Sequence, residues 1–192
     1  MSSHEPGQTL SDEHGRMLLE LAAAAIEHGL RTGRVLEVDP APYPEPLRAK
    51  RATFVTVERD GRLLGCIGTI HARTSAVEDV AKNAHGAVLY DPRCPRLDPD
   101  DLADLRIHIS LLTEPSPMTF ASEADLVEQL RPGVDGLLLE DGIYRGTFLP
   151  VVWATLPDPR DFLRHLKQKA GLPPTHWSDT VRVSRYTTEV IE

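Results

Sequence analysis

Cysteine and long apolar runs are scarce in this chain of 192 residues. Its two cysteines, Cys66 and Cys94, are not spaced as a paired-cysteine zinc motif. This excludes a disulfide framework and favours a reducing, cytoplasmic environment. No stretch approaches about 18 consecutive apolar residues, so we expect no membrane span. The N-terminal residues lack a basic segment followed by an apolar one, so we also expect no secretory signal.

Basic residues are too few to suggest a nucleic acid-binding surface. Against 29 Asp and Glu stand 21 Lys and Arg, which leaves a formal net charge of −8. Such a chain binds phosphate backbones poorly unless its basic residues cluster, and no basic run is present. The phosphate-binding Gly-x-x-x-x-Gly-Lys loop, the Gly-x-Ser-x-Gly elbow and the His-Glu-x-x-His motif are missing as well. We therefore expect no nucleic acid, no metal and no cofactor.

Proline, by contrast, is abundant: the 16 prolines are about 8% of the chain, against a usual level of about 5%. They divide it into short elements. Apolar periodicity and N-cap residues predict helices that begin after Ser11, Ser75, Ser122 and Asp158. Two Asp-Gly pairs, at 60–61 and 141–142, predict hairpins between apolar runs. Further strands are expected at 105–111 and 180–190.

Two hairpins and single strands between helices, without regular βαβ alternation, indicate an α+β fold. We expect a mixed, largely antiparallel sheet flanked by helices, with a smaller second lobe. The chain length fits one domain over residues 10–190, or one domain made of two lobes. Residues 1–9 are expected to be a flexible N-terminus.

The segment Gly65-Cys66-Ile67-Gly68 is the most unusual local feature, because glycine weakens a strand unless something approaches its backbone closely. One interpretation is a core thiol packed beside Leu64 and Ile70, since free cysteine is among the most buried residue types. The other is a thiol on the floor of a cleft, with Gly65 and Gly68 leaving room for a ligand. The first is favoured, because a reactive thiol needs a lowered pKa and access. Cys66 should then react slowly with alkylating reagents, and Cys94, on a proline-rich loop, faster.

Arg145 interrupts a second apolar strand at 143–149 and is followed by Gly146 and Thr147. A half-buried arginine there could bind a substrate carboxylate or phosphate. The alternative is a solvent-facing residue or a structural ion pair, and it is somewhat favoured. We expect the strands of Cys66 and Arg145 to be neighbours in one sheet or to face one pocket.

Several longer segments resemble the AMMECR-one domain family, whose bacterial and archaeal branch is named AmmeMemoRadiSam system protein A. They are LLGCIGTI, NAHGAVLYDPRCPRL, IHISLLTEPSPM, LRPGVDGLLLEDGIYRGTFLPVVWATLPDPRDFLRHLKQKAGLP and RYTTEV. The resemblance covers residues 10–190. It implies an α+β fold with a larger and a smaller lobe, and an association with a Memo-like protein and a radical S-adenosylmethionine enzyme. It does not supply a reaction.

The family signature Leu-Arg-Gly-Cys-Ile-Gly is changed in this chain, where Leu64 replaces the arginine. If that arginine binds an anion or lowers the pKa of the thiol, Arg145 or Arg62 would have to serve instead. Cys94 replaces a residue of a Phe-Pro-Pro segment, and it is interpreted as a substitute for a packing aromatic.

Two functions remain open. In the first, the protein is an accessory or binding component of a modification pathway, and a glycine-lined groove receives a partner segment. In the second, it is a thiol-dependent enzyme that uses Cys66 on a small anionic or peptide substrate. The residues that would line its pocket are Gly65, Gly68, Thr69, Arg145, Gly146 and Thr147. No general base is recognisable beside Cys66, which favours the first.

Overall fold

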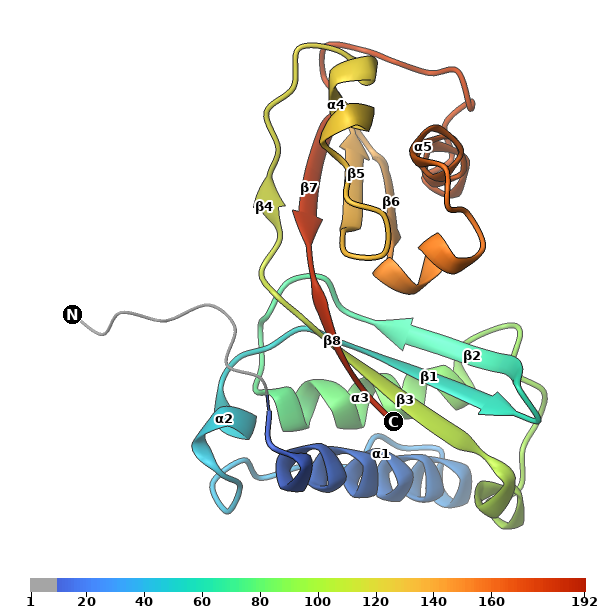
Figure 1. The fold of residues 1–192 in the computed structure, drawn as a ribbon. Helices are drawn as coiled ribbons and strands as arrows, with labels where there is room; N and C mark the ends of the chain where they lie inside the picture. The colour runs from blue at the N-terminus through green and yellow to red at the C-terminus, as the bar shows by residue number, and fades with distance from the viewer. Residues whose placement is uncertain (1–9) are drawn as a thin grey trace. The chain divides into compact units, whose positions relative to one another are not determined.

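The computed structural model describes residues 10–192, so the predicted flexible segment 1–9 lies outside the described residues. The fold is α+β, as the sequence predicts, with two four-stranded antiparallel sheets and several helices (Figure 1). The described chain divides into two compact units. Unit 1 runs to Glu114 and also contains Glu189–Glu192, whereas unit 2 is Pro115–Thr188.

Two long helices form one layer of unit 1, and both begin where the sequence predicts. Helix α1 (Asp12–Thr32) starts at Ser11, whose side chain accepts a hydrogen bond from the backbone N–H of His14. Helix α3 (Ala76–Leu89) starts with a capping box between Ser75 and Glu78. Local hydrogen bonds of this kind satisfy N–H groups that the first helical turn leaves without partners. A short helix α2 (Glu45–Arg48) and the 3-10 helix η1 (Pro99–Asp104) complete the helical part.

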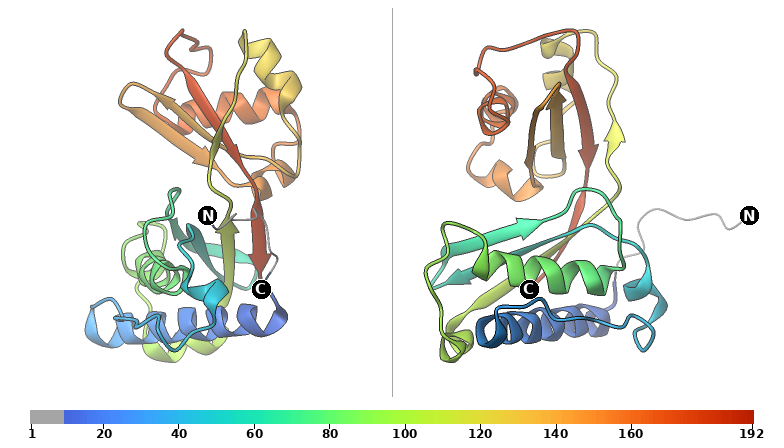
Figure 2. Two further views of the ribbon diagram at one scale, coloured as in Figure 1. Left: turned by 90° about the vertical axis from the view of Figure 1, so that its left-hand side faces the viewer. Right: turned by 180° about the vertical axis from the view of Figure 1, so that it is seen from behind.

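The sheet of unit 1 lies against these helices (Figure 2). Its strands, in the order β2-β1-β3-β8, are β2 (Arg62–Gly68), β1 (Thr53–Arg59), β3 (Arg106–Leu112) and β8 (Thr188–Ile191). Val55, Val57 and Ile109 are fully buried on the face that packs against α1 and α3. Since side chains alternate along a strand, Thr56 and its cross-strand neighbours lie on the opposite face.

Unit 2 is built around a second sheet and its own apolar core. Its strands, in the order β4-β7-β5-β6, are β4 (Ser116–Pro117), β7 (Arg182–Tyr186), β5 (Gly136–Asp141) and β6 (Tyr144–Phe148). The helical segments are α4 (Glu123–Gln129), η2 (Pro150–Ala154) and α5 (Pro159–Lys169). Trp153 stacks on Phe162 in the core and donates its indole N–H to the carbonyl of Asp135.

Among residues 10–192, no helix is both long and apolar enough to span a bilayer.

The two predicted hairpins belong to different sheets. Cys66 lies in β2 of unit 1, and Arg145 lies in β6 of unit 2. The prediction that their strands are neighbours in one sheet is therefore wrong. The first turn forms at Asp60-Gly61 as predicted, whereas the second lies one residue later than predicted, at Gly142 and Ile143, because Asp141 still pairs with Tyr144. The strand with which each hairpin pairs next is set by contacts far away in the chain.

Candidate functional site

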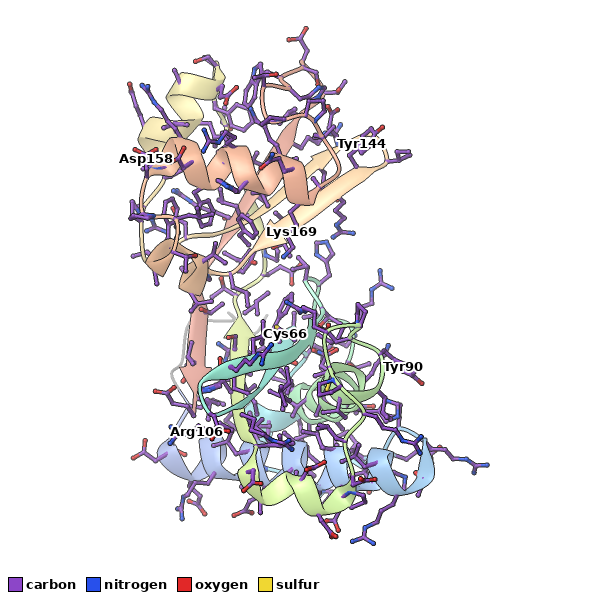
Figure 3. All side chains as sticks on the ribbon, turned by 90° about the vertical axis from the view of Figure 1, so that its right-hand side faces the viewer. Cys66, Tyr90, Arg106, Tyr144, Asp158 and Lys169 are labelled. Atoms are coloured by element: carbon purple, nitrogen blue, oxygen red, sulfur yellow. The ribbon has the colours of Figure 1, made fainter. Side chains whose placement is uncertain are left out.

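Cys66 lies on the sheet face of unit 1 that points away from α1 and α3. The register of β1 and β2 pairs it with Thr56, whereas the next residue, Ile67, contacts Gly86 of α3. Its side chain is half-buried and belongs to neither apolar core. The interpretation of Cys66 as a core thiol is therefore wrong. Figure 3 shows its position on the sheet, with Tyr90 beyond the end of α3.

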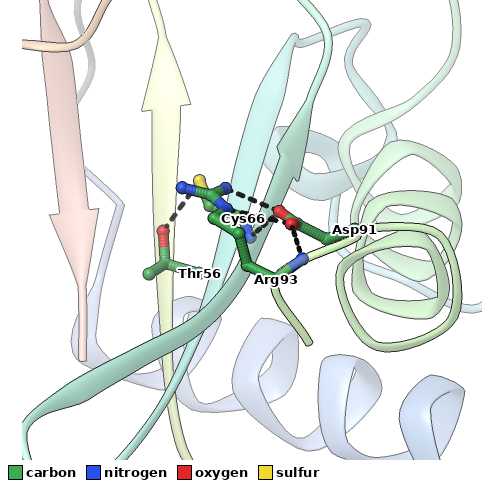
Figure 4. A network of polar contacts seen from close by, with 4 residues as sticks. All are labelled: Thr56, Cys66, Asp91 and Arg93. Carbon is green, nitrogen blue, oxygen red and sulfur yellow. Dashed lines mark hydrogen bonds and ion pairs between the residues drawn. The ribbon is translucent and has the colours of Figure 1, made fainter. Parts of the chain in front are cut away.

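Two polar groups hold Cys66 in place (Figure 4). The hydroxyl of Thr56 donates a hydrogen bond to Sγ at 3.2 Å. The backbone N–H of Cys66 donates to Oδ2 of Asp91 at 2.9 Å. Strand β2 is at the edge of its sheet, where backbone N–H groups on the outer side have no neighbouring strand. Asp91 accepts a hydrogen bond from one of these groups.

Asp91 also positions Arg93 beside the thiol. The Arg93 Nε donates to Oδ1 at 2.9 Å and Nη2 donates to Oδ2 at 2.6 Å, which is the forked geometry of a strong charge-assisted pair. The side chain of Asp91 is only 3% exposed, whereas that of Arg93 is 55% exposed. The guanidinium is therefore held by a buried carboxylate and remains largely exposed itself. Figure 4 shows it beside Cys66.

Each charged group in this network stabilises the charged form of its neighbour. Hydrogen bonds from Arg93 hold the pKa of the Asp91 carboxyl well below its usual range, and the N–H of Cys66 acts in the same direction. The pKa of Arg93 is raised, chiefly by its hydrogen bonds to Asp91 and also by the negative charge of a Cys66 thiolate. Because that attraction is mutual, Arg93 favours the charged form of the thiol.

Arg93, rather than Arg145 or Arg62, is the arginine that lies beside Cys66. Arg145 or Arg62 was expected to replace the arginine missing at Leu64, but Arg145 lies in unit 2, where it pairs with Glu140 at 3.4 Å. Arg62 lies opposite Arg59 at the start of β2. The sequence signal for this arginine is Asp-Pro-Arg at 91–93, shortly after α3. A residue before proline tends to end a helix, and an arginine two residues after the aspartate can fold back onto its carboxylate.

The glycines beside Cys66 make room for the protein itself. A Cβ on Gly65 would lie 2.0 Å from the carbonyl oxygen of Ala87, at the C-terminal end of α3. A Cβ on Gly68 would lie 2.2 Å from the ring of Phe54. Close packing against α3 therefore explains Gly65, and close packing against Phe54 explains Gly68. A ligand-binding role for these two glycines stays a prediction.

Thr69 belongs to a buried hydrogen-bond cluster that the sequence did not reveal. Its hydroxyl donates to Oδ2 of Asp79 at 2.7 Å. The same oxygen accepts hydrogen bonds from the N–H and hydroxyl of Thr53 and from the side chain of Asn83. Asp79 is 4% exposed, so the cluster fastens α3 to the beginning of β1 and to the residue after β2.

The predicted site residues of unit 2 have structural partners of their own. Thr147 donates to the carbonyl of Leu137 at 2.8 Å and lies 2.7 Å from the hydroxyl of Tyr186. A Cβ on Gly146 would lie 2.9 Å from the backbone nitrogen of Ala170. Binding roles for Arg145, Gly146 and Thr147 stay predictions. Across the part of the chain that the structure describes, no group of three or more His, Cys, Asp or Glu could hold a metal ion.

Comparison with known proteins assigns the family. The AMMECR1 family model matches residues 19–191. A protein of Methanothermobacter thermautotrophicus is 38% identical over 185 residues, which cover 94% of this chain and 95% of that one. A protein of Thermococcus gammatolerans is 38% identical over 192 residues, covering 95% and 92%. The crystal structure of the uncharacterised protein PH0010 from Pyrococcus horikoshii has a TM-score of 0.86 at 34% identity, covering 94% and 92%. The chain therefore belongs to the AMMECR1 family.

Proposed function

We propose that this AMMECR1-family chain acts through the thiolate of Cys66 on a small anionic electrophile. One observation carries the proposal: Asp91 holds the guanidinium of Arg93 beside Cys66, whose Sγ accepts a hydrogen bond from Thr56. The thiolate is the nucleophilic form of cysteine, and a neighbouring cation together with a hydrogen-bond donor stabilises it.

The exposed side of Arg93 supports an anionic substrate. Its bonds to Asp91 use Nε and Nη2, so Nη1 takes part in neither of them. A guanidinium recognises carboxylate and phosphate groups through several N–H donors at once. The compensating carboxylate of Asp91 is buried, and an approaching molecule therefore meets the positive group first.

Alkylation by two reagents of similar size tests this proposal. Iodoacetate and iodoacetamide both form an S–C bond to the thiolate and release iodide, but only iodoacetate carries a negative charge. Because both consume the thiolate, the ratio of their rate constants does not depend on the thiolate fraction. We expect the iodoacetate-to-iodoacetamide ratio at Cys66, resolved from Cys94 by peptide mapping, to fall about threefold to tenfold in Arg93→Gln.

Arg62→Gln is the matched control, because it removes an exposed arginine from β2, the strand of Cys66, and leaves the pair between Asp91 and Arg93 intact. Arg93→Lys keeps the charge and should retain part of the preference. An equal ratio in the parent chain and in a folded Arg93→Gln variant would refute the anion preference. Failure of Cys66 to react with either reagent at neutral pH would refute the proposal that Cys66 acts as a nucleophile.

A second candidate is the accessory role in a modification pathway with a Memo-like protein and a radical S-adenosylmethionine enzyme. The family resemblance supports these partners. The edge position of β2 favours a partner that adds a strand, although Asp91 occupies the N–H of Cys66. Calorimetric titration with each purified partner tests it. Tight binding that Cys66→Ala leaves unchanged would favour this role over the thiol-dependent one.

A further inference from the structure

Two hydrogen-bond donors approach the Cys66 thiol from the two sides of β2. Thr56 belongs to β1, the strand that pairs with β2, and its hydroxyl donates to Sγ at 3.2 Å. Arg93 comes from the free edge of β2, where Asp91 accepts a hydrogen bond from the backbone N–H of Cys66 and holds the guanidinium beside the thiol (Figure 4). An oxygen atom that bonds to Sγ therefore has a hydroxyl on the side of β1 and a guanidinium on the side of the sheet edge.

Both donors are in place before any substrate arrives. Asp91, whose side chain is only 3% exposed, holds Arg93 through Nε and Nη2. Thr56 lies in a strand that is paired on both sides, with β2 and with β3, so its backbone is fixed. Donors that are fixed in advance stabilise negative charge that develops on a substrate atom, because they need not reorganise during the reaction.

The positive charge of Arg93 helps some electrophiles more than others. A cation that lowers the pKa of a thiol also lowers the intrinsic nucleophilicity of its thiolate. The rate benefits when the bond that breaks places negative charge on an oxygen within reach of the same donors. The O–O bond of a hydroperoxide breaks in this way. Hydrogen peroxide is the smallest hydroperoxide, which suits a thiol that is half-buried.

We infer that Cys66 is a site of oxidation by hydrogen peroxide, with Thr56 and Arg93 as the groups that contact the peroxide oxygens. The inference rests on the thiolate of the proposed function but not on its preference for anions, because hydrogen peroxide is neutral. The thiolate attacks one oxygen, so that an S–O bond forms and the O–O bond breaks. Cys66 becomes a sulfenic acid, S–OH, and the other oxygen leaves as hydroxide. Sulfur loses two electrons and the peroxide gains them.

Rate constants for hydrogen peroxide and iodoacetamide, measured in parallel at Cys66, test the inference. Both reagents consume the thiolate, so the peroxide-to-iodoacetamide ratio does not depend on the thiolate fraction. Hydroxide accepts hydrogen bonds strongly as it leaves, whereas iodide accepts them weakly. In Thr56→Val, which replaces the hydroxyl by a methyl group in a side chain of similar shape, we expect the ratio to fall at least about tenfold. Thr56→Ser should restore it.

Two arginine variants and the second cysteine serve as comparisons. Arg93→Gln should lower the same ratio, whereas Arg62→Gln, at the start of β2, should leave it unchanged. Cys94 is the reference thiol within each sample, because it packs against the core of unit 1 and should keep its own ratio in both Thr56 variants. Trapping with dimedone, which reacts with sulfenic acids, followed by peptide mapping should place the oxidised group on Cys66.

Two outcomes would overturn the inference. One is a peroxide-to-iodoacetamide ratio at Cys66 that is equal in the parent chain and in Thr56→Val, when thermal melts show that both are folded. The other is a ratio at Cys66 of the parent chain that is no higher than the ratio at Cys94. Either result can occur while iodoacetate keeps its advantage at Cys66, so failure of this inference is distinguishable from failure of the proposed function.

Discussion

The carboxylate of Asp91 accepts a hydrogen bond from the backbone N–H of Cys66, 25 positions earlier in the sequence. The same carboxylate carries the guanidinium of Arg93. One buried side chain therefore fixes both the strand that presents the thiol and the cation beside it. This arrangement brings a positive charge to Cys66 from the loop after α3.

Asp91 should make the protein acid-sensitive. Its pKa is lowered in the folded state, so its contribution to the free energy of unfolding is fully present above its ordinary value of about 3.9 and is lost as the pH falls below it. We expect Asp91→Asn to lower the melting temperature at pH 7, and the gap between parent and variant to narrow progressively as the pH falls below about 4, toward the lowered pKa of the folded state. Thermal melts from pH 3 to 7 measure this, with exposed Asp100→Asn as the control. A gap between parent and variant that stays constant with pH would contradict it.

His85 should add a second pH dependence in a different range. It is 1% exposed, and burial lowers its pKa, outweighing the opposing effect of the Gly33 backbone. A lowered histidine pKa favours folding above the ordinary value of about 6.5, and this contribution is lost as the pH falls below it. The parent chain should therefore lose stability between pH 7 and 5, and His85→Leu should flatten that slope. Denaturant unfolding at each pH checks this against His14→Leu; equal slopes in parent and His85→Leu would refute it.

Gly65 should be needed for packing whether or not a ligand binds. In Gly65→Ala the new Cβ would meet the backbone carbonyl of Ala87, which cannot move without shifting α3. We expect a loss of about 1–3 kcal/mol in the free energy of unfolding. Gly68→Ala is the matched comparison, because its Cβ meets the ring of Phe54, a side chain that can rotate. Chemical denaturation should rank Gly65→Ala as the less stable variant, and the reverse order would show that the α3 contact is not the limiting one.

The two cysteines should differ in reactivity, in the order opposite to the one expected from the sequence. Burial raises the pKa of Cys94, which packs against the core of unit 1. Cys66 lies outside that core, beside the guanidinium of Arg93. At pH 7 we expect iodoacetamide to modify Cys66 at least about tenfold faster than Cys94. Peptide mapping over time measures both rates in one sample, and faster labelling of Cys94 would restore the original order.

Much of the local structure could be predicted from the sequence alone. The N-caps at Ser11 and Ser75 and the hairpin turn at Asp60-Gly61, whose φ values are both positive, depend on contacts within three or four residues. Short-range hydrogen bonds and backbone sterics fix such features wherever the rest of the chain goes. The α+β class follows from the same local patterns, because alternating and helical periods are visible in the residues themselves.

The site was decided by the tertiary structure. Alternation separates Cys66 from Gly65 and Ile67, but which of the two sets faces α3 depends on how that helix packs on the sheet. The partition of the two hairpins between separate sheets likewise depends on pairings such as β1 with β3, which join distant segments. Asp91 and Arg93 reach Cys66 only because the end of α3 lies against β2. Contacts over tens of positions leave no periodic trace in the sequence, so the network around Cys66 became visible only in the folded chain.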